Sequence, residues 1–82
     1  MNTENNMPDY VKRMVEEYKE LRERNTKLMN FINSEKFNGI PLMKKRFLLL
    51  QNEVMLAYEN ILNLRLDMEM AELSQKNKEE NQ

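Results

Sequence analysis

The sequence contains neither cysteine nor histidine, and it has only one glycine and two prolines among its 82 residues. Without cysteine, no disulfide and no thiolate metal site can form. Without histidine, the commonest general base and the usual zinc ligand are missing, which disfavours an enzyme. No cofactor and no metal are therefore expected. A chain this short buries a modest share of its surface, so self-association is the remaining way to stabilise it.

An excess of charge of one sign is also lacking, because 13 basic residues are matched by 14 acidic ones. This balance disfavours a nucleic acid polymer as a partner. The opening stretch MNTENNMPDY is polar and acidic, unlike a signal peptide. No apolar run reaches the length of a membrane span, and acidic residues interrupt each basic face. We therefore expect a cytosolic protein with no membrane partner.

The sequence does contain helical periodicity, which predicts an all-α fold. In the first half, apolar residues recur three and four positions apart, and Asn25 is the one polar member of the series. The apolar members are Val11, Met14, Tyr18, Leu21, Leu28 and Ile32. Asn25 has two interpretations at this point: a polar residue in an apolar seam that sets register and partner number, or a residue that faces solvent at a helix bend.

The segment NSEKFNGIP interrupts the periodicity. Gly39 is the expected turn residue, and Pro41 opens a second helix that runs into the low seventies. So short a connection predicts an antiparallel helical hairpin. We assign this hairpin domain to residues 8–73, between a mobile N-terminal arm (1–7) and a polar C-terminal tail (74–82).

The predicted second helix has more apolar residues than one partner helix can cover. Its heptad-like stripe consists of Phe47, Leu50, Val54, Ala57, Ile61, Leu64 and Met68. We expect the first helix to cover this stripe, which leaves four apolar residues in water: Leu48, Met55, Leu62 and Leu66. Burying one such side chain contributes about 1.5–3 kcal/mol, so a symmetric homo-oligomer is predicted. The alternative is that these residues stay exposed, or that the first helix bends to cover them.

Aromatic and cationic side chains occur together on the first helix. They are Tyr10, Lys12, Arg13, Tyr18, Lys19, Arg22, Arg24 and Lys27. Aromatic rings stack on nucleobases and guanidinium groups hold phosphate, although a charged helix face is more often simply solvated and the tyrosines can be core edges. Arg65 lies between two leucines in the apolar run of the second helix. It either holds an anion at an interface or forms an ion pair with a glutamate of the first helix.

Together these features resemble the helical hairpin domain of the phage anti-CBASS and anti-Thoeris sponge proteins. The first half is similar at Arg13, Glu17, Lys19, Leu21, Lys27, Leu28, Phe31 and Ile32. The second half is similar at Phe37, Gln51, Met55, Tyr58, Leu62 and Arg65. The resemblance covers about residues 10–66. Lys44 departs from it, because a glutamate is expected there, and this changes the local charge at any interface or pocket.

The resemblance implies a protein that binds cyclic nucleotide second messengers, either cyclic oligonucleotides or cyclic ADP-ribose derivatives, without cleaving them. Sequestration in the host cytoplasm keeps the effector of the bacterial immune system inactive. It also implies a symmetric homo-oligomer, often a hexamer, with pockets between protomers.

Carried onto this chain, the resemblance implies a stacking role for Tyr10 and phosphate contacts for Arg13, Arg24, Lys27 and Arg65. The competing hypothesis is a small oligomeric adaptor or inhibitor that acts by protein–protein contact.

Overall fold

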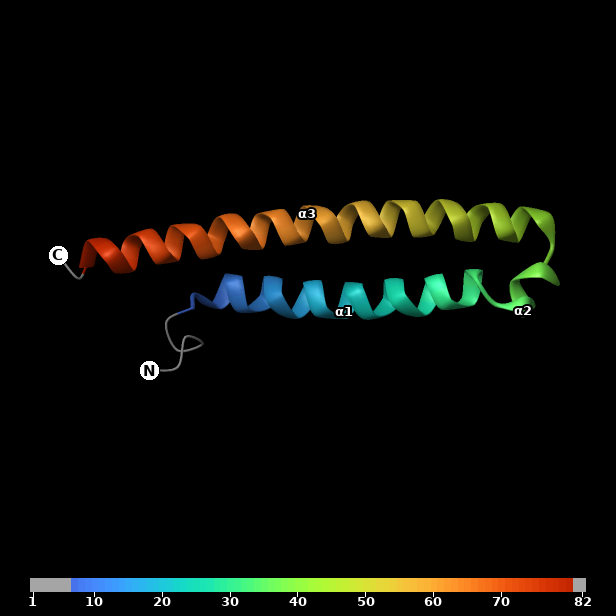
Figure 1. Ribbon diagram of the computed structural model, residues 1–82, viewed down its shortest axis with the longest axis horizontal. Helices are drawn as coiled ribbons and strands as arrows, with labels where there is room; N and C mark the ends of the chain where they lie inside the picture. Colours follow the sequence, from blue (N-terminus) through green and yellow to red (C-terminus); the bar gives the residue numbers. More distant parts are fainter. Residues whose placement is uncertain (1–6, 81–82) are drawn as a thin grey trace.

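The computed structural model describes residues 7–80, with side chains described as far as residue 76. Two long helices lie side by side and run in opposite directions, joined by one short helical turn (Figure 1). They are α1 (Asp9–Ile32), α2 (Glu35–Asn38) and α3 (Leu42–Glu80). The all-α prediction is confirmed. The predicted mobile arm falls mostly on residues outside the described part of the chain.

Local sequence explains where the helices begin and end. Pro8 precedes α1, and its carbonyl oxygen accepts hydrogen bonds from the backbone N–H groups of Val11 and Lys12. The predicted break contains the α2 turn, which ends at Gly39. This glycine has φ −89°, so the turn does not use the left-handed region that only glycine enters freely. At its far end α3 continues to Glu80, beyond the predicted stop in the low seventies.

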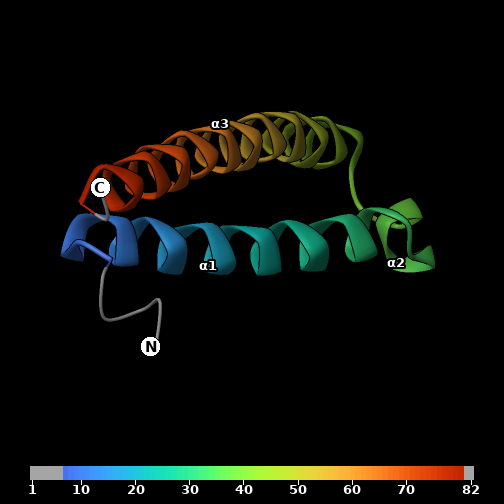
Figure 2. The ribbon, with the colours of Figure 1, turned by 60° about the vertical axis from the view of Figure 1, so that its left-hand side comes forward.

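The molecule is a rod rather than a globule. It measures 62 × 19 × 17 Å, and its radius of gyration is 18.1 Å, whereas a compact domain of this length has about 12 Å. Figure 2 shows that α3 is inclined to α1 rather than strictly parallel to it. No helix in the described range is both long and apolar enough to cross a bilayer.

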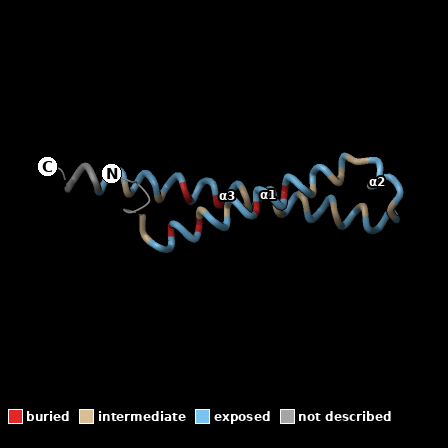
Figure 3. Tube along the Cα trace, turned by 90° about the horizontal axis from the view of Figure 1, so that it is seen from below, coloured by how far each residue is buried: buried red, intermediate tan, exposed pale blue. Residues whose placement is uncertain are grey.

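The core is a single line of side chains between α1 and α3. Five apolar residues are buried there: Val11, Met14, Leu21, Leu62 and Leu66. Figure 3 shows buried positions (red) on both long helices and none near the α2 end of the rod. Many more large apolar side chains of the described chain are exposed than buried, so the isolated hairpin leaves much of its apolar surface in water.

The face of α3 that contacts α1 is the opposite of the predicted one. We call this face the inner stripe: Leu48, Asn52, Met55, Glu59, Leu62, Leu66, Glu69 and Leu73, all buried or half-buried. The predicted contact face is exposed; for example, Phe47 and Val54 are 62% and 63% exposed. Leu62, predicted to lie in water, is fully buried.

Asn25 explains this choice of face. Its side chain is 1% exposed, and its Nδ2 donates hydrogen bonds to the carbonyl oxygen of Met55 (3.1 Å) and to Oε1 of Glu59 (2.9 Å). Of the two α3 stripes, only the inner stripe contains a carboxylate that can accept this bond. A buried amide without a partner costs about 1–3 kcal/mol, so packing α1 against the inner stripe avoids that cost. The solvent-facing interpretation of Asn25 is therefore wrong.

Candidate ligand-binding site

One side of α1 carries most of the candidate ligand-binding residues. Six residues recur three and four apart and so share one side of the helix: Tyr10, Arg13, Glu17, Glu20, Arg24 and Lys27. None of the six is buried. The cations and the tyrosine ring are therefore open to solvent in the single chain.

The neighbouring edge of α3 contributes Tyr58 and Arg65, which are two helical turns apart. The Tyr58 hydroxyl donates a hydrogen bond to Oε1 of Glu17 on α1. Near the N-terminal end of α1, the Tyr10 hydroxyl donates to Oε2 of Glu69 at 2.6 Å. These two bonds fasten the helices together along this side, which we call the tyrosine–arginine flank (the six α1 residues with Tyr58 and Arg65).

Both tyrosines of the flank have raised pKa values. The hydrogen bond to Glu69 is the main cause of the raised pKa of Tyr10, with smaller contributions from desolvation and the nearby charges of Glu69 and Glu72. The hydrogen bond to Glu17 does the same for the pKa of Tyr58, and the charge of Arg65 partly opposes it. A phenol that donates to a carboxylate resists ionisation, so both hydroxyls stay protonated at neutral pH.

Arg65 is not held by an acidic residue of α1 within the described side chains. Its Nη2 lies 4.0 Å from the sulfur of Met14, and Glu17 is engaged by Tyr58 instead. Of the two alternatives for Arg65, the ion pair with a glutamate of the first helix is therefore not formed. The guanidinium keeps its donors available for an anion from outside the chain.

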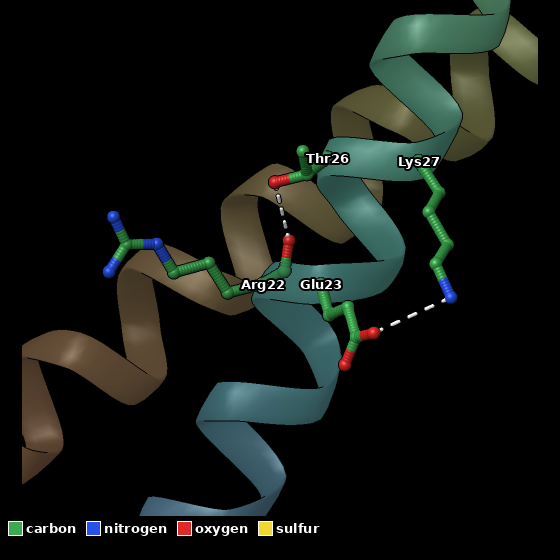
Figure 4. A network of polar contacts seen from close by, with 4 residues as sticks. All are labelled: Arg22, Glu23, Thr26 and Lys27. Carbon is green, nitrogen blue, oxygen red and sulfur yellow. Dashed lines mark hydrogen bonds and ion pairs between the residues drawn. The ribbon is translucent and has the colours of Figure 1, made fainter.

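Lys27 is the one candidate cation with an ion-pair partner in the described part of the chain. Its Nζ lies 3.5 Å from Oε1 of Glu23, and both side chains are largely exposed (Figure 4). Figure 4 also shows Thr26 donating to the carbonyl oxygen of Arg22, whose side chain extends away from Lys27. An exposed i, i+4 pair of this kind contributes roughly 0.3–0.5 kcal/mol, so it is easily exchanged for a stronger anionic partner.

A single hairpin does not gather all five predicted residues in one place. Tyr10, Arg13 and Arg65 lie near the same end of the rod, because Tyr10 contacts Glu69 and Arg65 contacts Met14. Arg24 and Lys27 are 11 and 14 residues beyond Arg13, about 16 and 21 Å further along α1 at 1.5 Å per residue.

Sequence reasoning missed two members of this site, Glu17 and Glu69, as the acceptors that position the tyrosines. For Glu17, the helical spacing of the sequence could have indicated this role. It lies seven residues after Tyr10, and seven residues are two helical turns, so both share the side of α1 that carries the cations. Glu69 gave no comparable signal, because it occupies a stripe predicted to face water.

Comparison with known proteins identifies a family. The model of a family described as Sequestin matches residues 8–68, which include both long-helix segments of the flank. No curated protein and no solved structure matches the chain significantly. The match confirms the family that the sequence resembles, that of the phage cyclic-nucleotide sponges.

Proposed function

Because the chain belongs to the Sequestin family, a family of sequestering proteins rather than enzymes, we propose that it binds a cyclic nucleotide second messenger and holds it uncleaved. The messenger is a cyclic oligonucleotide or a cyclic ADP-ribose derivative. Its removal in the host cytoplasm blocks CBASS or Thoeris signalling.

The observation that carries this proposal is the set of unpaired arginines on the tyrosine–arginine flank. Within the described side chains the single ion pair is that of Lys27 and Glu23, so Arg13, Arg24 and Arg65 have no salt-bridge partner there. Guanidinium groups bind phosphate oxygens in pairs, with well-defined geometry. The ring of Tyr10 is half-exposed and offers a surface for stacking on a base.

Self-association is part of the same proposal. Each large apolar side chain that passes from water into an interface contributes up to about 1.5–3 kcal/mol. The summed burial free energy of several such side chains per protomer exceeds the free-energy cost of association, about 4–15 kcal/mol. A symmetric homo-oligomer, for which a hexamer is our specific proposal, also lets two copies complete a pocket that one hairpin leaves spread along its length.

Titration calorimetry of the purified protein against a panel of cyclic di- and trinucleotides and cyclic ADP-ribose isomers tests this function. We expect saturable heat and a raised melting temperature with at least one panel member. The ligand recovered after heat denaturation should have its original mass and retention time. A hydrolysed product would show that the protein is an enzyme.

Native mass spectrometry with and without the same panel measures stoichiometry and ligand mass together. We expect an oligomer that gains whole ligand masses. An oligomer that binds no panel member under any condition would favour the competing protein-contact function.

A further inference from the structure

The exposed face of α3 is a second regular stripe, which we call the outer stripe. It consists of Met43, Phe47, Leu50, Val54, Ala57, Ile61, Leu64 and Met68, all exposed and spaced alternately four and three apart. At 3.6 residues per turn, this stripe lies on nearly the opposite side of α3 from the inner stripe. It is also the more apolar of the two, because the inner stripe includes Asn52, Glu59 and Glu69.

We infer that the outer stripe packs against the outer stripe of a second copy of this chain, with the two α3 helices antiparallel. The inference rests on the self-association in the proposed function and names its surface, orientation and register. An uninterrupted series of apolar residues with this spacing is the pattern of a coiled-coil seam. α1 occupies the other side of α3 and leaves this seam open.

Charge selects the antiparallel orientation. Residues 42–58 contain three cations and one acid, whereas residues 59–72 contain four acids and one cation. The first turn of α3 contains Lys44 and Lys45 and no acidic residue, so these cations lie unfavourably at the positive end of the helix dipole. An antiparallel copy places each basic half beside an acidic half, whereas a parallel copy places like charges together.

The apolar pattern selects one register. Met43 lies opposite Met68 of the second copy, Phe47 opposite Leu64, Leu50 opposite Ile61, and Val54 opposite Ala57. All eight positions then have an apolar partner. A shift of one heptad places Met43 opposite Gln75 in one direction, or Met68 opposite Lys36 in the other.

The same register sets the charged edges of the seam. On one edge, Arg46 lies close to Asp67 of the second copy. On the other edge, which is continuous with the tyrosine–arginine flank, Lys44 lies close to Arg65 of the second copy, the one like-charged approach in an otherwise complementary arrangement of basic and acidic halves. The two-fold axis therefore brings the flanks of both copies to one side of the seam and adds a cation to each Arg65, which suits a guest with several phosphate groups.

Disulfide mapping without any nucleotide tests the seam. Because the chain has no cysteine, each introduced thiol is unique. Isotopically labelled Phe47→Cys and unlabelled Leu64→Cys proteins are refolded together and oxidised, and the dimer masses are measured. We expect mixed dimers only. In a parallel seam these two positions are about 25 Å apart, and each cysteine lies beside the same position of the second copy. Disulfide-linked dimers of two identical variants would then form, and that result would overturn the inference.

Lys44→Cys mixed with Arg65→Cys, joined by a short bismaleimide, repeats the test on an edge where the apolar seam stays intact. Glu16→Cys, exposed on α1, reports random collision. Helical protein that gives no mixed product above this control in either pair would also overturn the seam. The cross-linking contains no nucleotide, so it tests the seam independently of messenger binding. A confirmed seam in a protein that gives no heat with any cyclic nucleotide would reject the proposed function but not the seam. Binding heat in a protein that forms no cross-link would reject the seam but not the proposed function.

Discussion

The side-chain amide of Asn25 lies 2.9 Å from a carboxylate oxygen of Glu59 and 3.1 Å from the carbonyl oxygen of Met55, inside an otherwise apolar line. This relationship ties the middle of α1 to one position on α3. A sliding shift of either helix would leave a buried amide and a half-buried carboxylate without partners. The polar pair therefore fixes the register of the hairpin, as a polar residue in a coiled-coil seam does.

Replacing Asn25 by alanine should destabilise the hairpin. The variant removes two hydrogen bonds and leaves Glu59 half-buried without its donor, so we expect the free energy of unfolding to fall by about 1–3 kcal/mol at equal protomer concentration. Glu59→Gln is the matched control, since its amide oxygen still accepts the bond, and it should fall by less. Chemical denaturation followed by circular dichroism measures both variants. Equal losses would show that the charge of Glu59, rather than the bond, stabilises the pair.

The same pair explains why sequence periodicity predicted the helices but assigned the wrong face of α3. Both stripes of α3 repeat with the spacing of a helix, so periodicity alone does not distinguish them. We expected α1 to cover the heptad-like stripe, which is the outer one. The deciding feature was Asn25 on α1, whose buried amide needs an acceptor, and the outer stripe offers no side-chain acceptor. Because the wrong face of α3 was expected to contact α1, Glu69 was not predicted as the acceptor for Tyr10.

Two leucines of α3, only two residues apart, should respond differently to truncation. Leu62 is fully buried in the hairpin core, whereas Leu64 is 59% exposed on the outer stripe. Leu62→Ala should therefore lower the free energy of unfolding by about 2–5 kcal/mol, even at the lowest protein concentration. Leu64→Ala should leave the dilute protein nearly as helical as the wild type.

Thermal melts over a range of protein concentrations separate these effects. Leu64→Ala should weaken the rise of the melting temperature with concentration, because association stabilises the folded state by mass action. Leu62→Ala should keep that rise but start from a lower temperature. Greater damage from Leu64→Ala in the dilute limit would show that the outer stripe contacts α1 after all.

Alkaline pH should weaken the tyrosine–arginine flank. The pKa values of Tyr10 and Tyr58 are raised in the folded chain, chiefly by hydrogen bonds to Glu69 and Glu17. The stability that they contribute is therefore fully present below the unfolded pKa of about 10, and it is lost as pH rises through the folded pKa. Melting temperatures of the wild type and of a Tyr10→Phe, Tyr58→Phe double variant measure this effect. The gap between them should be constant below about pH 10 and should narrow above it.

The roles of Tyr10 can be separated by two substitutions at the same position. Tyr10→Phe keeps a ring that stacks on a base but loses the hydrogen bond to Glu69, whereas Tyr10→Ala loses both. If stacking holds the messenger, calorimetry should show that Tyr10→Phe binds within a few-fold of the wild type. Tyr10→Ala should bind about 5- to 150-fold more weakly, the equivalent of about 1–3 kcal/mol for one stacked base. Sedimentation should show the same oligomer for both variants, since Tyr10 lies outside the outer stripe. If Tyr10→Phe binds as weakly as Tyr10→Ala, the hydroxyl and its bond to Glu69 position the site, and the ring is not a stacking platform.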